Sequence, residues 1–140
     1  MLGNIISKKI HQNEPFKKWI STLGDDVIVD MLEHSYKMCT TKSKSSGSSQ
    51  KGIEGEKMVY DILSKYYDIK STSKYAKSGD FQIKTDVGLI LVEVKNYSKI
   101  VGRIELDKFE RDIARDNNIK GAIFISLDAK IVGYNEYINF

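Results

Sequence analysis

The sequence predicts an α/β domain with elements in the order helix, strand, strand, strand, helix, strand, in which helices flank a mixed sheet. Apolar residues recur at helical spacing in 53–67 and 104–117, a hairpin pattern covers 80–85 and 89–95, and a short apolar run follows at 121–126. Because about 25 residues separate the last two strands, we expect them to be parallel and joined by a crossover helix.

The N-terminal part of the chain has a different character. Residues 1–39 are expected to form a helical N-terminal extension, with helices over 15–23 and 25–38. Residues 40–51 contain Ser, Thr, Lys, Gly and Gln and no apolar residue, which is typical of a linker or exposed loop. The α/β domain is therefore expected to occupy residues 52–140.

The helical segments of the domain carry their apolar residues on one side, which should face the sheet. In 53–67 that stripe consists of Val59, Ile62, Leu63 and Tyr66. Glu56 lies at the edge of this stripe. In 104–117 the inward residues are Leu106, Phe109 and Ile113. Further extended segments are expected at 68–74 and 130–138.

Composition limits the classes of function. The chain of 140 residues has a net charge of +3. Residues 1–51 hold 8 lysines against 5 acidic residues, whereas residues 52–140 hold 14 basic and 14 acidic residues. The domain is therefore not a basic one, and nucleic-acid binding would need local patches. No apolar run is long enough to span a membrane. Cys39 is the only cysteine, which favours a reducing, intracellular setting.

The hairpin places three charged residues in an otherwise apolar sheet. Side chains alternate across a strand, so Glu93 and Lys95 share one face. One hairpin register places Asp80 opposite Glu93, and a register shifted by one residue places Asp80 opposite Val94. We favour the first register because it sets apolar residues opposite apolar residues along the hairpin.

In the favoured register, two carboxylates face each other with Cβ atoms about 5 Å apart. Like charges in this arrangement are destabilising, but a hard cation reverses the sign, and Mg²⁺ is held by one or two carboxylates with waters and phosphate. Lys95, on the same face, suits contact with a scissile phosphate or a role in deprotonating an attacking water. Glu56, reaching from the preceding helix, is a further candidate ligand for metal or water.

A simpler interpretation is that Glu93 and Lys95 form a weak ion pair on a solvated face. Three observations count against it. The apolar run 89–92 indicates a central strand covered on both faces, Asp80 lies at a suitable distance on the partner strand, and Glu56 borders the apolar stripe of the preceding helix.

Asp80, followed after a short hairpin by Glu93-Val94-Lys95 and preceded by Glu56 in a helix, resembles the PD-(D/E)xK nuclease superfamily. This superfamily includes restriction endonucleases, archaeal Holliday-junction resolvases and Mrr-like enzymes. One departure is Gly79, which stands where the superfamily's name-giving proline is found.

The resemblance covers about residues 51–128 and implies a restriction-endonuclease-like fold. It implies a Mg²⁺-dependent endonuclease, with Mn²⁺ as an alternative cofactor, acting on DNA. The implied catalytic residues are Glu56, Asp80, Glu93 and Lys95. The implied metal ligands are Asp80 and Glu93, with Glu56 matching the helical glutamate of many members.

Contacts with nucleic acid would have to come from local basic residues. The candidates for phosphate contacts are Lys42, Lys44, Lys51, Lys99 and Arg103. Lysines in such segments are usually just solvated, and the charges interleaved over 103–116 favour ion pairs within one helix. Tyr97 is one of several tyrosines suited to base stacking. A homodimer is compatible with cutting two strands. Two alternatives stay open: a non-catalytic nucleic-acid-binding or assembly module on the same fold, and a metal-dependent RNA endonuclease.

Overall fold

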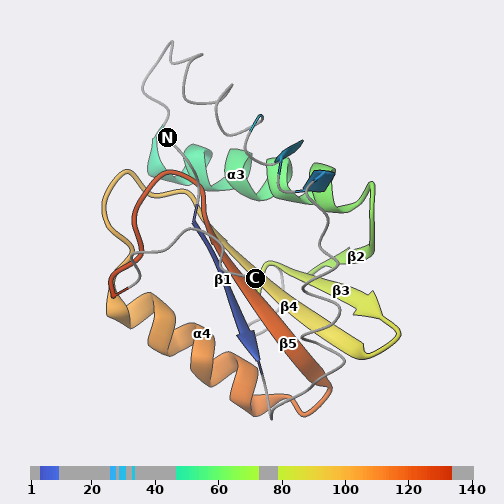
Figure 1. Cartoon of the computed structure of the whole chain (residues 1–140). Coiled ribbons are helices and arrows are strands. Elements are labelled where there is room, and N and C mark those ends of the chain that lie inside the picture. Colours follow the sequence, from blue (N-terminus) through green and yellow to red (C-terminus); the bar gives the residue numbers. More distant parts are fainter. Residues whose placement is uncertain are drawn as a thin grey trace.

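The sheet of this protein lies between two helices (Figure 1). The structure is a computed structural model, and it describes residues 4–9, 26–27, 29–30, 33, 47–72 and 79–133. Its elements are β1 (Asn4–Lys9), α3 (Ser48–Leu63), β2 (Asp68–Ser71), β3 (Phe81–Thr85), β4 (Gly88–Lys95), α4 (Arg103–Arg115) and β5 (Ile119–Ser126). The α/β class and the order of elements from α3 to β5 are those expected.

The five strands form one mixed sheet in the order β1-β5-β4-β3-β2. Strands β2, β3 and β4 are antiparallel neighbours, whereas β4 and β5 are parallel. Helix α4 connects these two parallel strands, which confirms the expected crossover. Strand β4 has a neighbour on both sides, as its continuous apolar run predicts.

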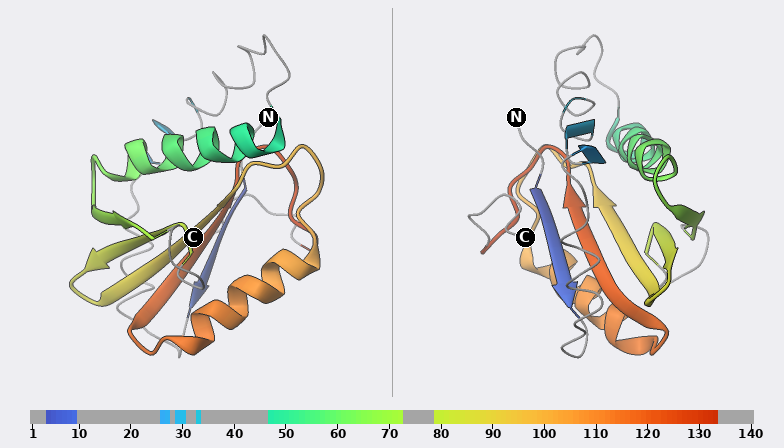
Figure 2. Two further views of the ribbon diagram at one scale, coloured as in Figure 1. Left: turned by 180° about the vertical axis from the view of Figure 1, so that it is seen from behind. Right: turned by 45° about the vertical axis from the view of Figure 1, so that its right-hand side comes forward.

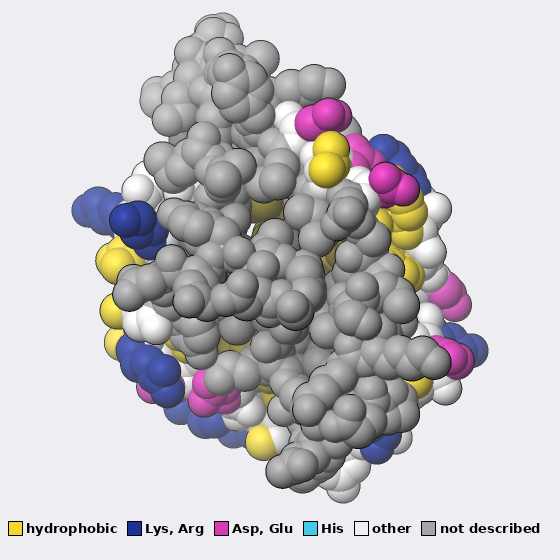
Figure 3. Space-filling model, in the orientation of Figure 1, with side chains coloured by type: hydrophobic (Ala, Val, Ile, Leu, Met, Phe, Trp, Pro, Cys, Tyr) yellow, Lys and Arg dark blue, Asp and Glu magenta, His cyan; other side chains and the backbone are white. Residues whose placement is uncertain are grey.

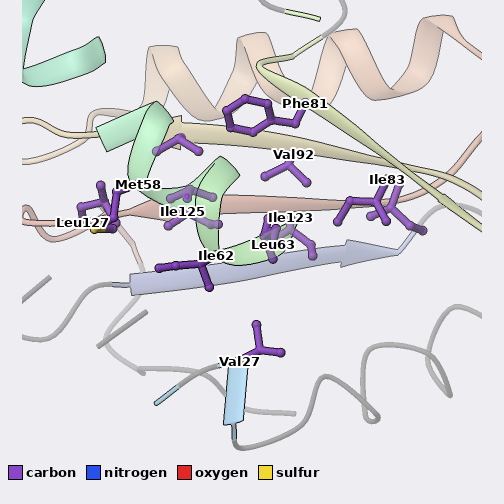
Figure 4. Packing of buried hydrophobic residues seen from close by; sticks show 13 residues of the cluster. Val27, Met58, Ile62, Leu63, Phe81, Ile83, Val92, Ile123, Ile125 and Leu127 are labelled. Atoms are coloured by element: carbon purple, nitrogen blue, oxygen red, sulfur yellow. The ribbon is translucent and has the colours of Figure 1, made fainter. Parts of the chain in front are cut away.

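The alternation of side chains in β4 divides the core into two layers. Val92 and Val94 point towards α3, and Leu91 points towards α4. The α3 layer, which is shown in Figure 4, also contains Met58, Val59, Ile62, Leu63, Phe81, Ile83, Ile90, Ile123, Ile125 and Leu127. The α4 layer contains Leu106, Phe109, Ile113, Ile119, Ala122 and Phe124, so the expected inward residues of this helix are confirmed. Figure 2 shows the two helices on opposite sides of the sheet.

Helix α3 passes close to the carboxyl end of β4. A Cβ atom placed on Gly55 would lie 2.8 Å from Asn96 Cβ and 2.9 Å from Leu127 Cδ1, so only glycine allows this approach. The Asn96 amide Nδ2 donates a hydrogen bond of 2.8 Å to the Lys51 carbonyl. The first turns of α3 are therefore fixed to the residues that follow β4.

Three boundary predictions were wrong. Residues 4–9 form β1, antiparallel to β5, in place of part of a helical extension. The expected linker 40–51 ends early, because Ser48 to Lys51 already belong to α3. Tyr66 lies beyond the end of α3 and is 44% exposed, because a helical stripe does not continue into the following turn.

Several predicted segments lie partly or wholly outside the described residues. Helix 15–23 and residues 40–46 are outside them. Of 25–38, the described residues Asp26, Val27, Val29, Asp30 and Glu33 are helical. Strand β2 ends at Ser71, and residues 73–78 are not described. Of 130–138, Ile131 forms an isolated parallel bridge with Val101, and residues 134–140 are not described.

The described N-terminal residues contribute to the same body. Val27 is buried in the α3 layer of the core. Asp30 Oδ2 lies 3.2 Å from Lys65 Nζ. Within the described ranges, none of the helices has the length and apolar character that crossing a bilayer requires.

Candidate active site

The favoured hairpin register is confirmed along β3 and β4. Phe81 pairs with Val92 and Ile83 with Ile90. One residue before this ladder, the Asp80 backbone N–H donates a hydrogen bond of 3.0 Å to the Val92 carbonyl. The regular ladder ends at Phe81, and Asp80 lies beside residues 92–94 of β4, which it contacts through its own N–H and through its carboxylate.

The carboxylate of Asp80 is held by the backbone of β4. Asp80 Oδ2 accepts a hydrogen bond of 2.7 Å from the Val94 N–H. Burial, followed by the nearby negative charge of Glu93, raises the pKa of Asp80 to about 7, although the Val94 N–H bond acts in the opposite direction. The two carboxylates are therefore close enough for the charge of Glu93 to oppose ionisation of Asp80.

Gly79, which precedes Asp80, has a backbone conformation that proline cannot adopt. Its φ is 65°, whereas the proline ring fixes φ near −65°. A Cβ atom here would also lie 2.6 Å from Leu91 Cδ1 and 3.0 Å from the Val92 carbonyl oxygen. In this chain the turn into β3 therefore needs glycine where the motif has proline.

Glu93 and Lys95 form an ion pair that is not on a solvated face. Lys95 Nζ lies 2.7 Å from Glu93 Oε1, and their side chains are only 16% and 15% exposed, respectively. Burial alone would lower the pKa of Lys95, but the charge and hydrogen bond of Glu93, with Tyr97 and Glu105 nearby, raise it overall. Lys95 is therefore an ammonium ion at neutral pH.

Two members of this cluster were not part of the site predicted from the sequence. Glu105, in the first turn of α4, places Oε2 at 3.6 Å from Lys95 Nζ. The Tyr97 hydroxyl donates a hydrogen bond of 3.4 Å to Glu105 Oε1, and the Tyr97 ring centre lies 5.9 Å from Lys95 Nζ. The short connection from β4 to α4 was the available signal, since it brings the first turn of α4 back to the end of β4.

Glu56 approaches from the other side of the sheet. Its helix covers the face of β4 that carries Val94, whereas Glu93 and Lys95 lie on the face of α4. Glu56 is half-buried, and burial together with the charge of Glu93 raises its pKa while Lys95 lowers it. Glu56 also lines an open groove of about 280 Å³ with Ile53, Lys57, Tyr60, Ser71 and Phe81.

The donor set fits one hard cation held by two carboxylates. Among the residues that the structure describes, no group of three or more His, Cys, Asp and Glu side chains has an arrangement that could hold a metal ion. Asp80, Glu93 and Lys95 come together, and Glu56 stays at the border of the site. Since Mg²⁺ uses one or two carboxylates and keeps several waters, the pair of Asp80 and Glu93 suffices chemically.

The predicted phosphate contacts are dispersed. Lys51 Nζ lies 3.0 Å from Asp128 Oδ2 and 2.9 Å from Ser98 Oγ. Arg103 Nε lies 2.9 Å from Asp107 Oδ1, and Lys99 is exposed. Lys42 and Lys44 lie outside the described residues. Along α4, at the lower left of Figure 3, basic and acidic side chains lie side by side, so this surface is not a single basic patch.

Comparison with known proteins does not identify a relative. The sequence matches no protein-family model, and the curated proteins and the solved structures likewise give no match. The assignment of a function therefore depends on the chemistry of the site itself.

Proposed function

We propose that this protein is a Mg²⁺-dependent endonuclease of the PD-(D/E)xK type that hydrolyses phosphodiester bonds in DNA. The observation that carries the proposal is the convergence of Asp80, Glu93 and Lys95 at the end of β4. Lys95 Nζ lies 2.7 Å from Glu93 in a half-buried site, and the Asp80 carboxylate accepts a hydrogen bond from Val94, the residue between them. Two carboxylates could hold a metal ion, and the neighbouring ammonium of Lys95 could contact a phosphate.

Each residue has a separate role in this proposal. Asp80 and Glu93 hold Mg²⁺, and the Val94 N–H fixes the orientation of Asp80. When bound, Mg²⁺ supplies charge neutralisation at the phosphate and makes water a better nucleophile at neutral pH. Lys95 binds a phosphate oxygen as an ammonium ion, because its raised pKa makes proton acceptance unfavourable. Glu56 orients a water at the border of the site.

The proposed restriction-endonuclease-like fold is supported by the arrangement of the elements. Helix α3 is followed by three antiparallel strands, then by α4 and the parallel strand β5. This is the order that the resemblance implies. The site lies at the carboxyl end of β4, where α3 and the β4–α4 connection meet.

A non-catalytic nucleic-acid-binding or assembly module is a second candidate. It is favoured by one observation, namely that Lys95 is already paired with Glu93 and lies near Glu105. Such a cluster resembles a structural ion-pair network as well as a catalytic site. The two candidates differ in whether bound nucleic acid is cut.

The decisive assay is cleavage of labelled duplex, branched and single-stranded DNA and of RNA with Mg²⁺ or Mn²⁺. We expect internal cuts in DNA by the native protein and losses of about 100-fold or more in Asp80→Ala and Lys95→Ala. Lys57→Ala is a matched control, because Lys57 is 73% exposed on α3 and pairs with Asp61.

The outcomes separate the candidates. Activity that survives both Asp80→Ala and Lys95→Ala contradicts the site. Binding of nucleic acid without cleavage of any substrate favours the non-catalytic module, and cleavage of RNA alone makes the protein an RNA endonuclease. Sedimentation with and without duplex DNA tests the expected homodimer.

A further inference from the structure

Lys95 lies between two carboxylates that come from different elements. Glu93, on the same strand, holds Nζ at 2.7 Å, and Glu105, on α4, places Oε2 at 3.6 Å. The other oxygen of Glu105 accepts the hydrogen bond of the Tyr97 hydroxyl. Lys95 thus has one carboxylate partner within hydrogen-bonding distance, Glu93, and a second one slightly farther away, Glu105.

The two partners are not equivalent once Glu93 binds a cation. A carboxylate that coordinates a divalent ion is a weaker acceptor for a neighbouring ammonium, and the two cations repel each other. A half-buried ammonium that loses its acceptor is costly. Glu105 is already close, and a movement of under about 1 Å would bring it to the usual length of a charged hydrogen bond.

We propose that Glu105 is a positioning residue that accepts the hydrogen bond of the Lys95 ammonium when Glu93 binds the divalent cation. This inference rests on the proposed function of the same site. Tyr97 orients Glu105 through its hydroxyl, while its ring lies beside the Lys95 ammonium. The exchange keeps Lys95 at the site and frees Glu93 for the cation.

Glu105→Gln tests this exchange because it removes the second carboxylate and preserves the shape of the side chain. In this variant Lys95 depends on Glu93 alone, so the ammonium competes more strongly with the cation. By calorimetry on the full-length chain without nucleic acid, we expect Mn²⁺ affinity to fall by about 3- to 10-fold. Tyr97→Phe should give a smaller fall, because it removes only the hydroxyl that orients Glu105.

A second genetic background separates positioning from simple charge. In Lys95→Met there is no ammonium to exchange, so adding Glu105→Gln should change Mn²⁺ affinity by less than about twofold. Asp107→Asn is the matched control on α4, since Asp107 pairs with Arg103 instead of Lys95. It should leave Mn²⁺ affinity within about twofold of the native value.

The outcomes are distinguishable from a failure of the proposed function. Equal losses of Mn²⁺ affinity from Glu105→Gln with and without Lys95 mean that Glu105 acts only by its charge, which overturns the inference. Native affinity in Glu105→Gln overturns it as well. If the native protein itself binds no Mn²⁺, the proposed function fails first and the inference fails with it. Cleavage kinetics add a check: Glu105→Gln should lower kcat and leave KM for DNA nearly unchanged.

Discussion

Lys95 Nζ lies 2.7 Å from Glu93 Oε1, and both side chains are less than one-fifth exposed. Exposed ion pairs contribute little to stability, because water already solvates both charges. A largely buried pair differs, since removing one partner leaves the other charge without compensation. The Lys95–Glu93 pair therefore matters for folding, whatever its role in chemistry.

Lys95→Met should lower the free energy of unfolding by about 1–3 kcal/mol in metal-free buffer, because it leaves the Glu93 carboxylate unpaired. Urea denaturation measures this change. The double variant Glu93→Gln/Lys95→Met should recover part of the loss. Lys57→Met, which removes an exposed lysine, is the control with an expected change under about 0.5 kcal/mol. An equal loss of stability in Lys95→Met and Lys57→Met would show that burial of the Lys95–Glu93 pair is unimportant.

Asp80→Asn should stabilise the metal-free protein at neutral and higher pH. The folded protein holds a proton on Asp80 up to about pH 7, whereas the unfolded chain releases it near the ordinary pKa of 3.8. The native state therefore binds more protons in this window, and stability falls as pH rises through it. The variant can keep the Val94 N–H bond through its amide oxygen.

Unfolding measured with urea at several values from pH 4 to pH 8 tests this prediction. The difference in the free energy of unfolding between Asp80→Asn and the native protein should be near zero at pH 4. It should grow to more than about 1 kcal/mol above pH 7. A difference independent of pH would mean that burial and Glu93 do not raise the pKa of Asp80.

Divalent cations should stabilise the native protein more at pH 8 than at pH 6, because Asp80 must lose its proton before it binds metal. At a concentration ten times Kd, the added stability is about 1.4 kcal/mol. Thermal melts with Mg²⁺ at the two pH values measure it. Glu54→Gln, on an exposed part of α3, should keep the effect, whereas equal stabilisation of Asp80→Asn would argue against Asp80 as a ligand.

Gly55→Ala and Gly52→Ala should have opposite effects, although both lie in α3. Alanine at 55 would place Cβ 2.8 Å from Asn96 Cβ, whereas nothing lies within 4 Å at 52. We expect losses of about 1–3 kcal/mol for Gly55→Ala and gains of up to about 1 kcal/mol for Gly52→Ala. Urea denaturation measures both. Equal changes would contradict the close contact of α3 with the end of β4.

The parts of the fold that local patterns determine were predictable. Apolar residues opposite apolar residues in the hairpin fixed the pairing of β3 with β4, since a shift of one residue would expose one strand's core face. The apolar stripe of 104–117 identified the buried residues of α4. Parallel pairing of β4 with β5 followed from the length of the connection.

Other features depended on long-range contacts that no local pattern records. Strand β1 pairs with β5, more than a hundred residues away in sequence, and its short segment carries no turn or hairpin signal. The Tyr66 error came from extending a helical period beyond the last helical residue, Leu63. Glu105 was assigned to pairs within its own helix, because helical spacing does not show a neighbour from another element.

The site was predicted where the hairpin alone determines it and was less complete where helices contribute. Glu93 and Lys95 follow from alternation along β4, and the hairpin register brings Asp80 to the same end of that strand. Glu56 was placed from a helical wheel, which gives the direction of a side chain on its helix but not the face of the sheet that the helix covers. The wheel therefore did not predict that Glu56 lies at the border of the site.

The most direct test of the central claim is a cycle of cleavage rates for Asp80→Asn, Glu93→Gln and the double variant, with Glu54→Gln as the control. If Asp80 and Glu93 hold one cation together, each single variant should lose about 100-fold or more, and the double variant should be little worse than either. Glu54→Gln should cleave at the native rate. Full activity in either Asp80→Asn or Glu93→Gln, or losses that multiply in the double variant, would contradict a shared metal site.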